Sequence, residues 1–202
     1  MEGELVRPNL LIIGKMGSGK DTIADYLVEE SGFHKIAMAD PLKEAAASVF
    51  PQAMASGNRN LRRTHLQLLG DIFRAHDINI LNKAILYNIT YKEMFPVVIS
   101  DIRLVTELEF FITHGFIPVG IDISDENRHQ RIYRRDGIYP DLKTTHHKTE
   151  TEVDRMYEMI NLFINNNGSF QELETSVDQL LNQLKSNPTL KIKSNSPQKI
   201  AL

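Results

Sequence analysis

Gly14-Lys15-Met16-Gly17-Ser18-Gly19-Lys20-Asp21-Thr22 is the most informative stretch of the chain. Its spacing is that of the phosphate-binding loop G-x-x-x-x-G-K-[ST], except that Asp21 replaces the Ser or Thr whose hydroxyl normally binds magnesium. The glycines leave room for backbone N–H groups to surround phosphate oxygens. A helix beginning at Lys20 or Asp21 would point its N-terminal N–H groups at the same phosphates, with Lys20 reaching the β- and γ-phosphates. The stretch therefore predicts a site for a nucleoside triphosphate.

The sequence on either side of this loop supplies the strand and the helix that it requires. Residues 9–13 are a short apolar run typical of a buried parallel strand, and Ile23, Tyr26 and Leu27 recur at helical spacing. This setting favours a phosphate-binding loop over a flexible glycine turn. We expect nucleotide contacts from the loop and the first helical turn, with Thr22 at the α-phosphate: Gly14, Gly17, Ser18, Gly19, Lys20, Asp21 and Thr22.

Composition limits the class of protein and its surroundings. The chain has 202 residues, no cysteine and no tryptophan, which excludes disulfides and thiolate metal sites and favours a reducing compartment, the cytoplasm. Its length predicts one domain, which we place at residues 1–184. No apolar run is long enough for a membrane span, and residues 1–8 do not resemble a signal peptide.

The last residues differ from the rest of the chain in charge. The formal net charge is -3, yet residues 185–202 hold Lys185, Lys191, Lys193 and Lys199 and no acidic residue. This basic tail is rich in Ser, Asn, Pro and Lys, which predicts a disordered segment. A solvated chain end is favoured over a nucleic-acid-binding role.

Strand and helix patterns alternate along the chain, which predicts an α/β fold with a parallel sheet covered by helices. The expected strands are 9–13, 33–39, 95–100, 116–123 and a last strand within 156–164. The expected helices are 20–31, 41–49, 60–75, 78–90, 106–114, 125–136 and 169–184, with a mobile loop at 137–150. No internal repeat is found.

Asp101 follows a core strand, at the edge of the sheet where ligands collect in open α/β folds. A carboxylate there can hold magnesium directly or through water, so Asp101 is a candidate metal ligand; the alternative is a cap of the next turn. Arg103 could bind a substrate phosphate with Glu107 orienting it, or the two could form a surface ion pair. For Asp21 we consider a magnesium contact or a role in holding Lys20 or the helix start.

Four arginines of the predicted helix 125–136 form a stripe. On an ideal helix Arg128, Arg131, Arg134 and Arg135 fall within an arc of about 120°. Guanidinium groups on one face repel one another unless an anion binds there, and each can donate two hydrogen bonds to phosphate oxygens. Beside a flexible loop, the stripe predicts a small helical lid at about 125–150 that closes over the triphosphate. A solvated charged face is the alternative.

A second basic set lies on the predicted helical insert at about 42–92. It comprises Lys43, Arg62, Arg63 and Arg74, and the amides of Gln67 and Asn82 could read the edge of a base. From this set and the strand end, the expected substrate contacts are Lys43, Arg63, Gln67, Arg74, Asp101 and Arg103. The pair His146 and His147 invites a metal interpretation, which we disfavour because no other His or Cys cluster supports it.

Several segments, in order, resemble the phage-type deoxynucleoside monophosphate kinases. They are 19–22 with 24–26, 39–43, 66–70 with Arg74, 100–103 with Glu107, His147 with Thr149 and Glu150, and 166–169. The resemblance spans roughly 9–184 and implies a three-layer P-loop kinase fold with about five parallel strands, the loop strand central. It also implies transfer of the γ-phosphate of ATP, with Mg²⁺, to a deoxynucleoside monophosphate.

Two segments depart from the family pattern. Residues 77–82 lack a tryptophan that relatives often carry, and Arg103-Leu104-Val105-Thr106-Glu107 replaces a more usual Arg-Phe-Pro-Asn-Glu. Both leave the base preference open.

A monophosphate acceptor is already largely dianionic at neutral pH, so such a reaction needs charge neutralisation and not a general base. We expect Lys20, Arg128, Arg131 and Arg135 to be catalytic. The alternatives are a kinase for a ribonucleoside monophosphate or another phosphorylated metabolite, and an ATP-binding protein without transferase activity. The small nucleotide is the expected partner, no strong nucleic-acid signal is present, and a homodimer is left open.

Overall fold

The structure is a computed structural model that describes residues 7–139 and 148–186. The chain forms two compact units, one of residues Met1–Lys35 with Phe95–Leu202 and one of Ile36–Met94. The insert expected at about 42–92 falls within the second unit. Of the predicted lid, residues 140–147 with both histidines lie outside the described residues, as do residues 187–202 of the basic tail. Within the described part of the chain, no helix is long and apolar enough to cross a membrane.

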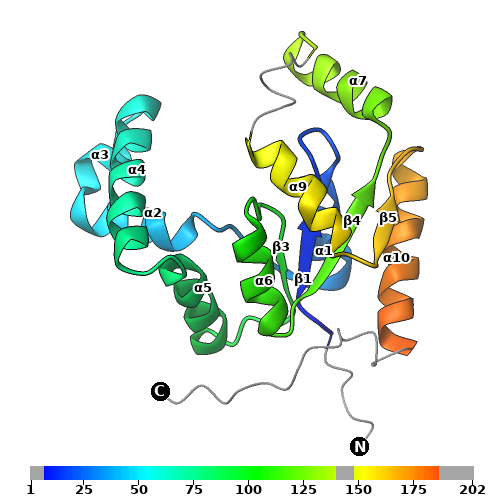
Figure 1. Ribbon diagram of the computed structural model, residues 1–202, viewed down its shortest axis with the longest axis horizontal. Helices are drawn as coiled ribbons and strands as arrows, with labels where there is room; N and C mark the ends of the chain where they lie inside the picture. Colours follow the sequence, from blue (N-terminus) through cyan, green and yellow to red (C-terminus); the bar gives the residue numbers. More distant parts are fainter. Residues whose placement is uncertain (1–6, 140–147, 187–202) are drawn as a thin grey trace, which may run out of the picture. The chain divides into compact units, whose positions relative to one another are not determined.

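A five-stranded sheet forms the centre of the first unit, as expected (Figure 1). Its order is β2-β3-β1-β4-β5, with β1 Leu10–Ile13, β2 His34–Ile36, β3 Val97–Ile99, β4 Ile117–Asp122 and β5 Phe163–Asn165. The strand before the glycine-rich loop is central and parallel to both neighbours, with Leu10 opposite Val98 in β3 and Ile117 in β4. The loop therefore leaves the carboxyl edge of the sheet between two other strand ends.

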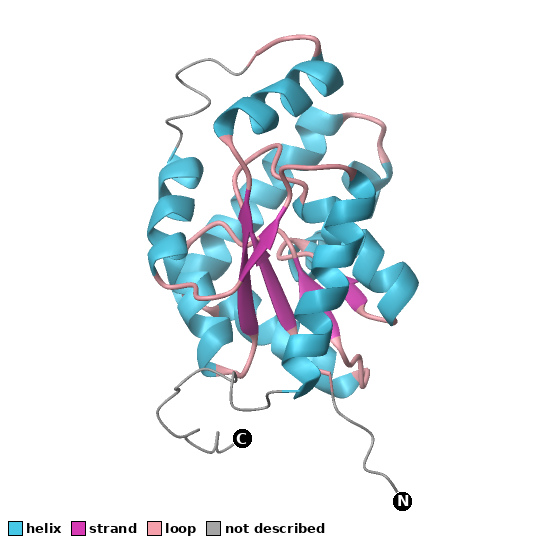
Figure 2. Ribbon diagram, turned by 90° about the vertical axis from the view of Figure 1, so that its right-hand side faces the viewer, coloured by secondary structure: helices cyan, strands magenta, loops and turns pink. Residues whose placement is uncertain are grey.

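Helices cover both faces of this sheet (Figures 1 and 2). Helices α1 Lys20–Ser31 and α10 Phe170–Ser186 pack on one face, while α6 Val105–Thr113 and α9 Lys148–Glu158 pack on the other. All four residues of β1 are fully buried, which explains why the strand is apolar throughout. Helix α7 Asp125–Asp136 follows β4 and has the bounds that the sequence predicts.

The second unit is helical. It contains α2 Asp40–Val49, α3 Pro51–Ala55, α4 Arg59–His76 and α5 Ile80–Tyr91. Leu42, Ala46 and Leu69 form its small buried cluster, with Phe50, Leu66 and Phe73 packed around them.

The prediction of a strand within 156–164 is wrong over most of its length. Met156 is fully buried within helix α9, and only 163–165 are extended. Val153 and Met156 of α9 are both buried, three residues apart as on one face of a helix, and Ile160 is buried just after the helix ends. The strand predicted at 33–39 is also shorter, because residue 37 already leads into the turn before α2.

Candidate active site

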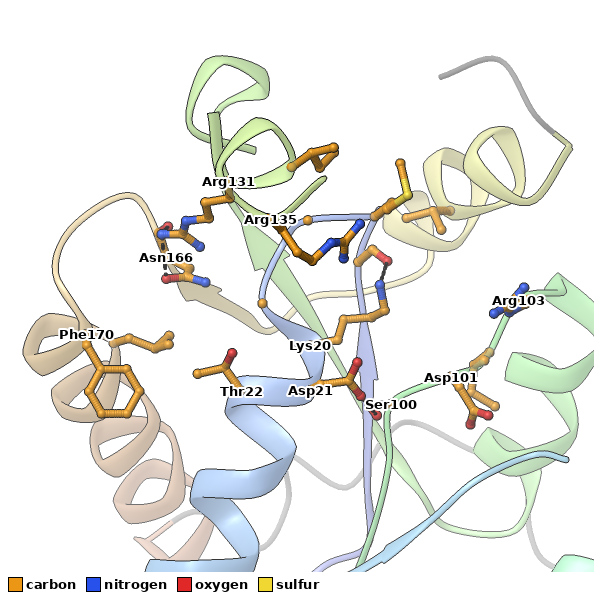
Figure 3. Close-up of a pocket in the computed structure, with 18 of the residues that line it drawn as sticks. Lys20, Asp21, Thr22, Ser100, Asp101, Arg103, Arg131, Arg135, Asn166 and Phe170 are labelled. Carbon is orange, nitrogen blue, oxygen red and sulfur yellow. Dashed lines mark hydrogen bonds between the residues drawn. The ribbon is translucent and has the colours of Figure 1, made fainter. Parts of the chain in front are cut away.

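A cavity of about 670 Å³ opens at the carboxyl edge of the sheet in the first unit (Figure 3). It brings together residues of the loop, the end of β3, helix α7 and the β5–α10 turn. Lys20 and Asp21 lie between two sides of the site, with Arg131, Asn166 and Phe170 toward one side and Asp101 and Arg103 toward the other. The lining residues include Gly14, Gly17, Gly19, Lys20, Asp21, Thr22, Ser100, Asp101, Arg103, Arg131, Arg135, Asn166 and Phe170.

Two glycines of the loop adopt backbone conformations that other residues rarely take. Gly17 has φ 81° and Gly19 has φ 93°. Each is also closely packed from outside the loop: a Cβ at Gly17 would lie 2.8 Å from Ile132, and one at Gly19 would collide with Nδ2 of Asn166. Glycine is therefore required at both positions for conformation and for space.

Lys20 begins helix α1 and folds back over the loop. Its Nζ donates to the carbonyl oxygens of Gly14 at 2.6 Å and Lys15 at 3.1 Å. The loop carbonyls thus hold the ammonium group over the loop, and Lys20 lines the cavity together with the exposed Thr22. In contrast to Thr22, the side chain of Ser18 is fully buried, and its hydroxyl makes no hydrogen bond in the protein.

Asp21 is tied to the neighbouring strands. Its Oδ1 accepts from Ser100 Oγ at 3.1 Å and lies 3.2 Å from Nζ of Lys35, which also contacts Asp25 at 2.8 Å. Partial burial acts to raise the pKa of Asp21, but the hydrogen bond and charge of Lys35, then Ser100 and the charge of Lys20, outweigh it and lower the pKa. Asp21 is therefore ionised at neutral pH. Its partner Lys35 was not predicted from the sequence.

The end of β3 contributes the other side of the site. Asp101 is half-buried and Arg103 is exposed, and both line the cavity, as does the buried Ser100. The carboxylates of Asp21 and Asp101 are thus held at one cavity. Among the residues that the structure describes, no cluster of three or more His, Cys, Asp or Glu could form a metal site.

Glu107 orients the main chain at Arg103. Its carboxylate accepts from the backbone N–H groups of Arg103 at 2.9 Å and Leu104 at 3.1 Å, so it caps the start of α6. Burial raises the pKa of Glu107; the two backbone hydrogen bonds oppose this, and the charge of Asp101 adds to it. The expected support of Arg103 by Glu107 thus acts through the peptide backbone.

We expect Glu107→Gln to change how stability depends on pH. Because the pKa of Glu107 is raised on folding, its contribution is fully present below the unfolded pKa of about 4.3 and is lost as pH rises through the folded value. Glutamine does not ionise, so the free energy of unfolding of the variant minus that of wild type should increase from about pH 4 to about pH 7. Urea denaturation across this range measures it. Glu109→Gln, on an exposed face of the same helix, is the control, and a flat difference for Glu107→Gln would contradict the expectation.

The four arginines of the predicted stripe lie in different environments. Arg131 and Arg135 line the cavity, whereas Arg134 is exposed and is not among the lining residues. Arg128 is only 4% exposed; its guanidinium donates to Asp125 at 2.8 Å and to the carbonyl of Met16 at 3.2 Å. Arg128 thus contacts the back of the loop and is not among the residues that line the cavity. Periodicity identified a shared helix face but not what each side chain meets.

Two further residues at the cavity have no role predicted from the sequence. Asn166 is 3% exposed and contacts the loop, and Phe170 is an exposed aromatic residue at the first position of α10. Both follow β5 at the carboxyl edge of the sheet, and that position is the signal that could have identified them.

The other predicted acceptor contacts lie in the second unit. Arg63, Gln67 and Arg74 are exposed on α4, and on an ideal helix they fall within an arc of about 40°. Lys43 contacts Asp40 at 2.8 Å, and Arg74 contacts Asp71 at 3.4 Å. These four residues stay predicted contacts.

The central parallel strand, glycine-rich loop and following helix define a P-loop α/β fold. The structure is similar to a dephospho-CoA kinase from Campylobacter jejuni, with a TM-score of 0.57 and 12% identity over 89% of this chain and 98% of that one. It is also similar to a shikimate kinase from Acinetobacter baumannii, with a TM-score of 0.50 and 18% identity over 89% and 94%. At these identities the likeness establishes the fold.

Residues 9–95 match the family model of deoxynucleotide monophosphate kinase. The chain is also 28% identical to a protein of Acanthamoeba polyphaga mimivirus that is provisionally named a deoxynucleotide monophosphate kinase, over 74% of this chain and 92% of that protein. Both matches confirm the resemblance drawn from the sequence motifs, and with it the expectation of an enzyme of the nucleotide kinase class.

Proposed function

We propose that the protein transfers the γ-phosphate of ATP to a deoxynucleoside monophosphate and releases ADP and the diphosphate. A phosphate oxygen of the acceptor forms the new bond to the γ-phosphorus as the bond to the β–γ bridging oxygen breaks. The observation that carries this proposal is a single cavity with groups for two anions. The loop and Lys20 lie between Arg131 on one side and Arg103 on the other (Figure 3).

In this proposal Lys20, Arg131 and Arg135 neutralise the charge that develops on the transferring group. All three line the cavity, and arginine suits phosphate because its planar guanidinium can donate two hydrogen bonds. Arg128 is a support of the loop through the carbonyl of Met16. The acceptor needs no general base, since its phosphate is already largely dianionic at neutral pH.

Magnesium fits the oxygen groups of the same cavity. Asp21, Ser100 and Asp101 offer carboxylate and hydroxyl oxygens, the ligand type that Mg²⁺ prefers. A bound magnesium ion would neutralise part of the phosphate charge. Asp21 already bonds Ser100 and Lys35, which favours contact with the ion through water.

Asp21→Ser tests this role. The variant restores the hydroxyl of the usual motif and removes an ionised carboxylate, so we expect ATP binding to persist while the magnesium concentration for half-maximal activity shifts by about tenfold. Magnesium titrations of ADP release would measure the shift. Asp25→Ser is the control, because Asp25 shares Lys35 but does not line the cavity. Superimposable titration curves for Asp21→Ser and wild type would contradict the role.

Phe170 is suited to stacking against the nucleobase of ATP. Its side chain is 56% exposed although it lines the cavity, and base–aromatic stacking contributes about 1–3 kcal/mol. We expect Phe170→Ala to raise the KM for ATP by about tenfold, with the acceptor KM unchanged. Phe170→Tyr keeps the ring and should retain the wild-type KM. Equal values of KM for ATP in all three proteins would rule out the stacking contact.

A coupled ADP-release assay tests the function itself. ATP and Mg²⁺ are supplied with a panel of deoxynucleoside and ribonucleoside monophosphates, and each acceptor is compared with a reaction that lacks it. Release that depends on deoxynucleoside monophosphates supports the proposal, whereas preference for ribonucleotides indicates another monophosphate kinase. No acceptor-dependent release with any member of the panel would overturn the proposal and favour a protein that binds ATP without transferring phosphate.

A further inference from the structure

We propose that Asn166 is a positioning residue that couples the glycine-rich loop to Arg131 and holds the guanidinium group where ATP phosphates bind. Nothing in the loop motif or the arginine stripe requires this residue. The inference rests on the proposed function only in placing Arg131 at the phosphates of ATP.

The side chain of Asn166 bridges the loop and helix α7. Its Nδ2 donates to the carbonyl of Ser18 at 2.7 Å, and its Oδ1 accepts from Nη2 of Arg131 at 3.2 Å. The same Nη2 also donates to the backbone carbonyl of Asn166 at 2.9 Å. Figure 3 shows Arg131 and Asn166 facing each other at one side of the loop. The site therefore requires both a donor and an acceptor in one short side chain, which is the chemistry of an amide.

Packing fixes the amide in this position. Asn166 is 3% exposed, and its backbone N–H donates to the carbonyl of Asp122 at 2.8 Å, which anchors the turn to the end of β4. Its Nδ2 occupies the space that a Cβ of Gly19 would need. Nη1 of Arg131 lies 3.6 Å from the position that a Cβ of Gly19 would take, so the guanidinium group is held directly beside Gly19.

The next residue attaches the start of α7 to the same turn. Oδ1 of Asn167 accepts from the backbone N–H of Ser124 at 2.8 Å, and Nδ2 of Asn127 donates to the carbonyl of Asn167 at 3.2 Å. The helix that carries Arg131 is thus tied to the β5–α10 turn at its first residues. Asn166 then fixes the position of the guanidinium group at the end of the Arg131 side chain, where the interaction with an anion would occur.

The surroundings of Arg131 disfavour its positive charge. Burial lowers the pKa of Arg131, and the charge of Arg134 lowers it further. A guanidinium group in this environment gains from a neutral acceptor that orients it without cancelling its charge. An aspartate at 166 would instead pair with Arg131 and would also place an anion against the carbonyl of Ser18.

A double-mutant cycle on ATP binding tests the coupling. ATP affinity is measured by isothermal titration calorimetry for wild type, Asn166→Ala, Arg131→Ala and the double variant. We expect each single change to weaken binding by about tenfold and the double variant to be little weaker than Arg131→Ala alone. A double variant whose loss equals the product of the single losses within about twofold would overturn the inference.

Turnover and a second substitution separate positioning from a general loss of structure. Asn166→Asp has the same shape, and we expect it to lower kcat and ATP affinity while the acceptor KM stays near wild type; its melting temperature shows whether the variant is folded at the assay temperature. Asn161→Ala, an exposed amide just before β5, is the matched control and should leave all four quantities unchanged. If Asn166→Ala does not fold, the cycle is run with Asn166→Ser, which introduces no charge, and additive losses there overturn the inference equally.

The binding cycle does not depend on phosphoryl transfer. Additive losses in ATP affinity, with acceptor-dependent ADP release intact, would remove the role of Asn166 and leave the proposed function standing. Coupled losses in a protein that releases no ADP with any acceptor would do the reverse.

Discussion

Lys20→Met is expected to lower kcat/KM for ADP release by about 10²- to 10³-fold, the cost of removing one preorganised group that stabilises the transition state. Methionine keeps the length and apolar stem of the side chain but removes the charge. The ammonium group of Lys20 is held 2.6 Å from the carbonyl of Gly14, beside the space for the phosphates. Initial rates of acceptor-dependent ADP release, with ATP varied at saturating acceptor, measure the effect.

Lys15→Met is the matched control for this prediction. It makes the same change within the same loop, but Lys15 contacts Asp154 of helix α9 at 2.6 Å and is not among the residues that line the cavity. The pair is partly exposed to solvent and contributes little, so we expect less than about a tenfold change. Equal losses for the two variants would indicate a general effect on the loop and would contradict a specific role for Lys20.

The features that could be predicted from the sequence are those formed by residues close together along the chain. The loop, its strand and its helix occupy one short segment, and apolar runs identified β1, β3 and β4 because buried parallel strands are continuously apolar. Asp101 was identified because it directly follows such a strand, and the structure places it in the cavity with Arg103. Each of these inferences needs only local pattern and the rule that ligands collect at the carboxyl edge.

What the sequence could not predict are contacts between distant segments. Asn166 contacts the loop although 148 positions separate it from Ser18, and the resemblance at 166–169 gave no role for its side chain. Lys35 was missed for a related reason. It lies in the short strand β2, and its ion pair with Asp21 forms only once the fold brings the two residues together. Arg128 shows the converse error, because helical spacing placed it with Arg131 although the loop buries it.

Gly19→Ala should abolish most ATP binding. The backbone at Gly19 has φ 93°, so alanine would be strained there, and its Cβ would also collide with Nδ2 of Asn166. Relief requires movement of the loop or of Asn166, and Asn166 holds both the carbonyl of Ser18 and the side chain of Arg131. A displacement of about 1 Å at such a site can cost about a hundredfold, which is the loss we expect in ATP affinity by calorimetry.

Gly32→Ala separates strain from collision. Gly32 ends the same helix with φ 68°, but a Cβ there would meet no atom within 4 Å. Both variants should lose about 1–2 kcal/mol of stability from the left-handed backbone, and only Gly19→Ala should lose ATP binding. Gly32 is not among the residues that line the cavity, so its variant reports the stability cost of the left-handed backbone alone, whereas Gly19→Ala also reports the effect of a side chain within the loop. Wild-type affinity in Gly19→Ala would show that the loop tolerates a side chain at this position, contrary to the packing of Asn166 against it.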